Sequence, residues 1–165
     1  MFDLKITDIT SAPAIALGWA DKTISLINTD GSANPSFGPG HKVWAIDDLE
    51  SEKEECHRPG MRHAPTMNDI KSILEFTGTF ADDDKVLIHC HAGLCRSTAV
   101  AVLALIQHGA TPEEAMNKVI EVRPKAWPNK LIIRLGDTAL EMDWTLMTFM
   151  EQWWDENLNK IDWDE

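Results

Sequence analysis

The stretch VLIHCHAGLCRST, residues 86–98, passes from an aliphatic run through a short loop into a run of small residues. A continuous aliphatic run of this length is typical of a strand that is covered on both faces of a parallel sheet. The residues from Arg96 to Gln107 are small or aliphatic almost throughout, which predicts a buried helix that ends at His108-Gly109. A strand, a tight loop and a helix in this order place a candidate site at the carboxyl end of the strand, next to Cys90.

The rest of the chain predicts further strands and helices around this stretch. Apolar and β-branched residues cluster in three short runs that predict strands, at residues 4–9, 23–27 and 42–46. Apolar residues at helical spacing predict helices at residues 66–81, 111–123, 128–141 and 144–158. The pairs Thr66/Asp69 and Thr111/Glu114 have the spacing of N-terminal capping boxes. Together these elements predict an α/β domain with a central, mainly parallel sheet of four to five strands flanked by helices.

The composition predicts one domain over residues 1–165 and disfavours two classes of partner. Of the 165 residues, 44% are hydrophobic and 25% are charged. Lys and Arg number 15 against 27 Asp and Glu, and the net charge of -12 opposes attraction to nucleic acid or to an anionic membrane surface. The longest apolar run, Ala99 to Ile106, is too short to span a bilayer, and the first residues do not resemble a secretion signal. Since an odd number of cysteines, three, fits a reducing compartment, we expect a cytoplasmic protein.

The loop after the central strand carries the groups needed to bind a phosphate and to attack it. In a loop that wraps a helix N-terminus, successive backbone N–H groups converge on a common centre and bind an anion. Arg96, at the start of the helix, can hold two phosphate oxygens with its planar guanidinium. The same surroundings favour the thiolate of Cys90, which is the nucleophilic form of cysteine. The predicted phosphate-binding residues are His91, Ala92, Gly93, Leu94, Cys95 and Arg96.

The spacing His-Cys-x5-Arg-Ser, from His89 to Ser97, resembles the active-site motif of the cysteine-dependent protein tyrosine phosphatases. The resemblance implies that Cys90 displaces a phosphorylated side chain and forms a cysteinyl-phosphate, which water then hydrolyses. It also implies that Ser97 stabilises the departing thiolate, and that His89 orients the loop and helps to hold Cys90 ionised. No metal and no cofactor are expected.

A carboxylic acid that protonates the leaving oxygen must come from outside this loop. Asp82 to Asp84 precede the central strand and would lie at its other end, some 20 Å away at about 3.3 Å per residue. Asp47 and Asp48 follow the strand predicted at 42–46, and they lie at the same edge as Cys90 if the two strands are parallel. The phrase VWAIDD, residues 43–48, resembles the acid loop of compact dual-specificity and PRL-like phosphatases, in which the second acid donates the proton. We therefore predict Asp48 as the general acid and keep Asp47 as the alternative.

A third stretch, RPKAWPN at residues 123–129, resembles the segment that buttresses the catalytic loop in dual-specificity phosphatases. Lys130-Leu131 departs from the family, which usually has Gly-Phe at this point. Asn129 is predicted either to steady the loop or a water molecule, or to cap a helix. The resemblance covers roughly residues 23–141. The acidic, Trp-rich end at residues 144–165 is expected to pack on the domain, with a dimer or partner surface as the alternative.

The expected substrate is a phosphorylated protein or peptide. The chain contains no Tyr, the residue with which large tyrosine phosphatases wall a deep pocket, so the resemblance implies a shallower, dual-specificity-like site. Such a site would hydrolyse phosphotyrosine, with phosphoserine or phosphothreonine as further substrates. Two alternatives stay open: a phosphatase for phosphoinositides or other small phosphoesters, which the absence of Lys from the loop disfavours, and an inactive phosphate-binding module. The oligomeric state is not predicted.

Two further features have more than one interpretation. A cluster of basic residues either flanks the pocket or forms a solvated loop, and it consists of His57, Arg58, Arg62 and His63. Cys95 resembles the second loop cysteine of the low-molecular-weight tyrosine phosphatases, which implies a reversible disulfide with Cys90 that protects the nucleophile. The alternative is that Cys95 only packs against its neighbours.

Overall fold

The four strands form one parallel sheet, as the sequence predicts. The computed structural model describes residues 1–30, 36–51 and 63–160. The strands lie in the order β1-β4-β2-β3 and every neighbouring pair is parallel. They are β1 (Asp3–Thr7), β2 (Lys22–Ile27), β3 (His41–Ala45) and β4 (Lys85–His89). The carboxyl ends of β3 and β4 therefore lie at the same edge of the sheet, which is the condition that brings Asp47 and Asp48 towards Cys90.

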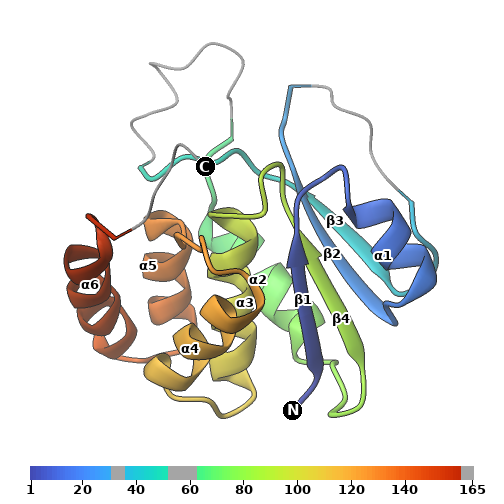
Figure 1. Cartoon of the computed structure of the whole chain (residues 1–165). Coiled ribbons are helices and arrows are strands. Elements are labelled where there is room, and N and C mark those ends of the chain that lie inside the picture. The colour runs from blue at the N-terminus through green and yellow to red at the C-terminus, as the bar shows by residue number, and fades with distance from the viewer. Residues whose placement is uncertain (31–35, 52–62, 161–165) are drawn as a thin grey trace.

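The helices divide unequally between the two faces of the sheet. Figure 1 shows α1 (Ala12–Gly18) on one side and all the other helices on the opposite side. Those other helices are α2 (Met67–Thr77), α3 (Arg96–Gln107), α4 (Pro112–Val122), α5 (Lys130–Ala139) and α6 (Thr145–Asn157). Within the described ranges, no helix has the length and apolar character that crossing a membrane requires.

Helix α3 forms the centre of the larger face. Its residues from Arg96 to Leu105 are all buried, so the small and aliphatic run after the catalytic loop packs on every side. Gly136 of α5 allows the closest approach, because a Cβ at that position would lie 2.2 Å from Cδ2 of Leu103. Helix α6 packs on the same core through Leu146, Met147, Met150 and Trp154. This tight packing fixes the N-terminus of α3, where the catalytic loop ends.

The capping boxes at Thr66 and Thr111 are present as predicted, whereas α1 is absent from the predicted helices. The helix has only seven residues, which is too short for a periodic apolar pattern. Its start is nevertheless encoded, since Asp8 accepts hydrogen bonds from the amides of Thr10 and Ser11, both at 2.9 Å. This turn also ends β1 at Thr7, two residues before the predicted end of the strand.

Candidate active site

The loop between β4 and α3, residues 90–95, lies at the carboxyl edge of the sheet and is called the catalytic loop below. Gly93 has a φ of +70°, and a Cβ there would lie 2.5 Å from the carbonyl carbon and oxygen of Thr7. Only glycine fits this position, because both the backbone conformation and the space exclude a side chain. The end of β1 therefore presses against the loop, and the amide of Ile9 also donates to the carbonyl of His91 at 3.1 Å.

The carbonyls of residues 91–95 in the catalytic loop point outward, and each accepts a hydrogen bond. Arg123 donates from Nη2 to Ala92 O at 2.8 Å and from Nε to Gly93 O at 3.1 Å. The amide of Trp127 donates to Leu94 O at 2.8 Å and the amide of Asn129 donates to Cys95 O at 3.1 Å. In a trans peptide the N–H points away from the C=O of the same unit. The amides of Gly93, Leu94, Cys95 and Arg96 are therefore directed to the inside of the loop.

Cys90 lies at the base of this cradle. Its side chain is 2% exposed. The amide of Gly93 donates to Sγ at 3.2 Å, so this loop amide points inward, and Ser97 Oγ lies 3.2 Å from Sγ. Both groups can stabilise negative charge on the sulfur, either in the resting protein or when the thiolate departs.

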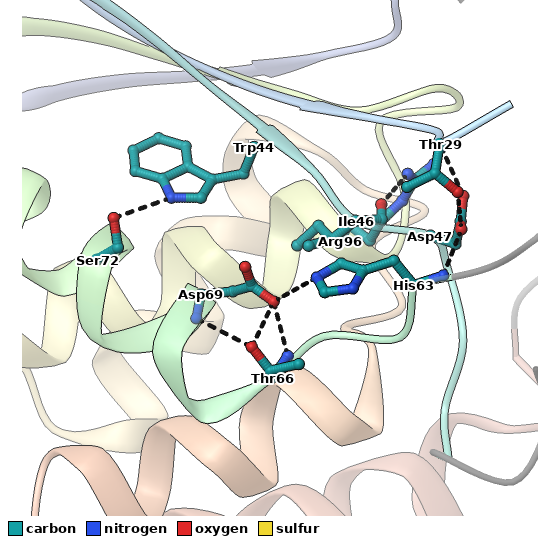
Figure 2. Close-up of polar contacts among 9 residues, drawn as sticks. All are labelled: Thr29, Trp44, Ile46, Asp47, His63, Thr66, Asp69, Ser72 and Arg96. Carbon is teal, nitrogen blue, oxygen red and sulfur yellow. Dashed lines mark hydrogen bonds and ion pairs between the residues drawn. The ribbon is translucent and has the colours of Figure 1, made fainter. Parts of the chain in front are cut away.

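Arg96 places a buried positive charge next to the loop. The residue is 2% exposed, and Nη1 donates to the carbonyl of Ile46 at 2.7 Å, a contact drawn in Figure 2. Nε is also buried, and no hydrogen-bond acceptor for it exists among the residues that the structure describes. A buried guanidinium with an unsatisfied N–H is costly unless an anion binds there. The arrangement is therefore that of a site for an oxyanion above a cysteine.

The two adjacent carboxylates of the acid loop, residues 46–49, have different environments. Asp47 is fully buried, and it accepts hydrogen bonds from the amide of Thr29 at 2.9 Å, from Thr29 Oγ1 at 2.5 Å and from the amide of His63 at 3.0 Å. As Figure 2 shows, Asp47 thereby ties the segment after β2 to the segment before α2. Both oxygens of the Asp47 carboxylate are therefore engaged in hydrogen bonds that hold these segments together, as expected of a residue with a structural role.

Asp48 is partly exposed and faces the catalytic loop. Asn129 Nδ2 donates to Asp48 Oδ1 at 2.8 Å. Burial, followed by the nearby carboxylate of Asp48 and by Cys90, raises the pKa of the Cys95 thiol, so these three side chains lie close together. Of the predicted roles of Asn129, the helix cap is confirmed, because Oδ1 accepts from the amide of Ile132 at 3.0 Å at the start of α5, whereas its side-chain amide bonds the acid loop and not the catalytic loop.

Solved phosphatase structures share this fold. The human tyrosine phosphatase-like serine/threonine/tyrosine-interacting protein matches with a TM-score of 0.61 at 21% identity, covering 85% of this chain and 92% of that chain. PTPMT1 in complex with PI(5)P matches with a TM-score of 0.57 at 16% identity, covering 86% and 94%. Human DUSP28 matches with a TM-score of 0.53 at 22% identity, covering 85% and 94%. The chain has the fold of the compact, dual-specificity-like cysteine-dependent protein tyrosine phosphatases.

Two curated relatives of this phosphatase-fold chain are similar in sequence over part of their length. The phosphatidylglycerophosphate phosphatase PTPMT1 of Arabidopsis thaliana is 34% identical over 88 residues, which are 52% of this chain and 24% of that protein. The MAP kinase phosphatase with leucine-rich repeats protein 3 of Dictyostelium discoideum is 31% identical over 104 residues, which are 60% of this chain and 11% of that protein. The chain thus spans about a quarter of the length of the first relative and about a tenth of the second. No family model matches the chain.

His89, the first residue of the phosphatase motif, is an uncharged residue at neutral pH. It is 1% exposed, and burial lowers its pKa from 6.5 to about 4. Any help that it gives to an ionised Cys90 therefore comes from orientation and hydrogen bonding, since no positive charge is present. Its Nε2 contacts Ser25 Oγ at 2.5 Å. Ser25 is absent from the predicted site, and its only sequence signal is a polar residue within the apolar strand β2.

The remaining predicted residues are dispersed. Asp82 to Asp84 precede β4 at the opposite edge of the sheet, as predicted. His63 contacts Asp69 Oδ2 at 2.9 Å at the start of α2, while His57, Arg58 and Arg62 lie outside the described residues. His91 and Ala92 are exposed at the rim of the loop.

Cys90 and Cys95 are both free thiols, and the raised pKa of Cys95 makes it a poor attacking thiolate for a disulfide.

Proposed function

We propose that this chain hydrolyses phosphate monoesters through a cysteinyl-phosphate on Cys90, with phosphotyrosine proteins or peptides as its main substrates and phosphoserine or phosphothreonine as further ones. One observation supports the proposal above the others: inward-facing loop amides and the buried, incompletely bonded guanidinium of Arg96 surround a buried cysteine. A phosphoryl group with two negative charges satisfies these donors. The sulfur then lies directly below the phosphorus atom.

The residues around this cradle suggest how the two steps proceed. The sulfur of Cys90 attacks phosphorus, the bond between phosphorus and the substrate oxygen breaks, and Asp48 gives its proton to that oxygen. Water then attacks the cysteinyl-phosphate and loses a proton to the Asp48 carboxylate, so that inorganic phosphate leaves. The Ser97 hydroxyl, 3.2 Å from Sγ, stabilises the thiolate that departs in this second step.

Asp48 is preferred over Asp47 because its carboxylate has room to act. Asp47 accepts three hydrogen bonds from Thr29 and His63 and is fully buried. Asp48 is partly exposed, and its carboxylate is bonded by the Asn129 amide and approached by the Cys95 thiol. A proton donor must reach the leaving group of a bound substrate, and only the second carboxylate is available for this.

The substrate class is the finer part of the proposal. The variable positions of the loop, His91, Ala92, Leu94 and Cys95, carry no Lys or Arg for extra phosphates, and the chain has a net charge of -12. Both features disfavour a highly phosphorylated lipid on an anionic membrane. A lipid substrate is supported by the similar protein of Arabidopsis thaliana, which is named a phosphatidylglycerophosphate phosphatase. A lipid or other small phosphoester is therefore the second candidate substrate.

Turnover of p-nitrophenyl phosphate tests the reaction. The unmodified protein should release p-nitrophenol, and Cys90→Ser should abolish the release. Cys95→Ser makes the same exchange five residues later and should retain turnover, because only the backbone of Cys95 faces the phosphate. Binding of a phosphopeptide without any turnover by the unmodified protein would instead identify an inactive phosphate-binding module.

A second experiment separates the substrate classes. The variant Asp48→Ala should retain the phosphate cradle and bind substrates without rapid release. Binding to phosphotyrosine peptides in preference to vesicles that contain phosphatidylglycerophosphate or a phosphoinositide supports the protein substrate. The reverse order of affinity would assign the chain to lipid phosphatases.

A further inference from the structure

Three polar side chains form a continuous hydrogen-bonded chain across β3, β2 and β4, beneath the catalytic loop. His41 Nε2 lies 2.7 Å from Ser25 Oγ, and Ser25 Oγ lies 2.5 Å from His89 Nε2. At the outer end, the amide of Phe37 donates to His41 Nδ1 at 3.1 Å. Ser25 is directly opposite His89 in the register of β2 and β4. The proposed reaction assigns no role to Ser25 or His41.

The number of available protons determines the direction of every hydrogen bond in this chain. The Phe37 amide can only donate, so His41 Nδ1 is an acceptor and the proton of the neutral ring is on Nε2. His41 Nε2 therefore donates to Ser25 Oγ. The buried Ser25 hydroxyl has one proton, and His89 Nε2 is the one remaining hydrogen-bond partner among the described residues to which it can donate that proton. His89 must then carry its own proton on Nδ1.

The Nδ1–H of His89 lies next to the backbone of Cys90. Nδ1 is buried, and among the described residues no acceptor meets full hydrogen-bond geometry with it. The group that acts on it is the backbone of Cys90, which partly offsets the lowering of the His89 pKa by burial. An N–H directed at the backbone of Cys90 restrains the start of the catalytic loop, whereas a bare nitrogen in its place would repel a carbonyl oxygen.

The surroundings favour the neutral forms of both imidazoles in this chain of side chains. Ser25 is fully buried, and burial lowers the pKa of His41 as well as that of His89. The ring of Phe37 covers both imidazoles, with its centroid 4.7 Å from that of His41 and 6.2 Å from that of His89. Phe37 also packs against the small cluster of Ala12, Ala16 and Leu87 under α1. The two hydrogen bonds of Ser25 Oγ therefore lie in an interior of low dielectric constant, where each is stronger than in water.

We propose that Ser25 and His41 are positioning residues of the active site, which fix His89 as the neutral Nδ1–H tautomer and so hold the backbone of Cys90 in its catalytic geometry. This inference rests on the proposed function for its kinetic consequence. The tautomers themselves follow from the hydrogen bonds alone: Nε2–H for His41 and Nδ1–H for His89. Neither residue contacts the reacting atoms.

The ¹⁵N chemical shifts of the histidine rings test the tautomers directly in the intact protein. The expected spectrum shows opposite tautomers for His41 and His89. Ser25→Ala removes the link, and the His89 ring should then change to a mixture of tautomers. A single Nδ1–H tautomer of His89 that persists in folded Ser25→Ala would overturn the proposal, and so would an Nε2–H tautomer in the unmodified protein.

Kinetics provide the second readout. Ser25→Ala should lower kcat for an aryl phosphate by roughly ten- to a hundred-fold through misplacement of the nucleophile, with a much smaller change in KM. Ser25→Thr keeps the hydroxyl and should restore most of the rate. Thr23→Val is the matched control, because it removes another buried hydroxyl from β2 that is not part of the hydrogen-bonded chain. Equal rate losses in Ser25→Thr and Ser25→Ala, in folded proteins, would contradict the proposal.

A second pair of variants tests the outer residue of the chain. His41→Gln retains an N–H that can donate to Ser25 and should keep most of the activity, while His41→Leu should lose rate in the direction of Ser25→Ala. The effects of Ser25→Ala and His41→Leu should not add in the double variant. If the unmodified protein has no phosphatase activity, the proposed function fails, but the ring spectra still decide whether Ser25 sets the tautomer of His89.

Discussion

The catalytic loop and the acid loop lie at the same edge of the sheet, but they are held in place by different means. The catalytic loop is fixed through its backbone, since the carbonyls of residues 91–95 are bonded to Ile9 and to the segment 123–129. The acid loop has backbone bonds as well, from the amides of Ile46 and Asp47, but it also depends on side chains, above all the buried carboxylate of Asp47 and the amide of Asn129. The conformation of the catalytic loop is therefore compatible with different side chains at most of its positions. The conformation of the acid loop depends on the identity of a few residues that are distant in sequence.

This difference predicts that, among conservative changes, a substitution of Arg96 has the largest effect on activity, because Arg96 binds the phosphoryl group through its side chain. Arg96→Lys keeps a positive charge but loses the planar fork of donors and the bond to Ile46 O. We expect kcat/KM for p-nitrophenyl phosphate to fall by about a thousand-fold or more. A loss below tenfold in a folded variant would show that the loop amides bind the phosphoryl group without the guanidinium.

The next effect separates the neighbouring acids in the acid loop. Asp48→Asn should lower kcat by about a hundred-fold on phenyl phosphate, whose leaving group needs a proton, and the loss should be much smaller for a phosphate ester with a good leaving group. Asp83→Asn, at the opposite end of β4, is the control and should leave kcat unchanged. An equal loss on both esters would remove Asp48 from the role of general acid.

Asp47→Asn should lower the free energy of unfolding and have only a small effect on kcat. The neutral amide weakens the hydrogen bonds from Thr29 and His63 and leaves buried donors poorly matched, which costs about 1–3 kcal/mol in the free energy of unfolding. Urea unfolding measures this cost, and kcat per folded molecule should stay within a few-fold of the unmodified protein. If Asp47→Asn lowered kcat much more on phenyl phosphate than on an ester with a good leaving group, and Asp48→Asn did not, then Asp47 and not Asp48 would be the general acid.

The last effect concerns His89 and appears only on acidification, while the activity at neutral pH is untouched. Its pKa is about 4 in the folded protein and 6.5 as the ordinary value, so the unfolded chain binds the extra proton between these two pH values. The free energy of unfolding should therefore decrease as the pH falls from 6.5 to 4, by roughly 3 kcal/mol in total. Urea unfolding of His89→Gln over the same range should show a correspondingly weaker dependence on pH, and an identical dependence in both proteins would contradict the assignment.

The sequence predicts the catalytic loop far better than it predicts what surrounds it. Residues 86–98 are contiguous, and the strand, the turn at Gly93 and the buried helix α3 follow from local patterns that the packing reinforces. The acid loop needs the parallel order of the strands before Asp47 and Asp48 can be placed. Even then, their different roles depend on Thr29, His63 and Asn129, which are distant in sequence and match no local motif.

Ser25 and His41 show the same limit more strongly. Each is a single polar residue at a strand position, and only the register of β2 against β4 places Ser25 opposite His89. Helix α1 is a different case, because Asp8 and Pro13 encode its start although the helix is too short for an apolar period. Local turn chemistry could have indicated α1, whereas no local signal could have joined β2 and β3 to His89.

The most direct test of this account is the chemical identity of the reaction intermediate. The protein should be mixed with an aryl phosphate, quenched in acid within milliseconds and digested, and the peptides should be examined by mass spectrometry. A phosphoryl group should be found on Cys90 of the unmodified protein and should be absent from Cys90→Ser. It should accumulate in Asp48→Asn, because this substitution slows its hydrolysis. Turnover with no phosphoryl group on Cys90 at any time, or with a phosphoryl group on another residue, would contradict it.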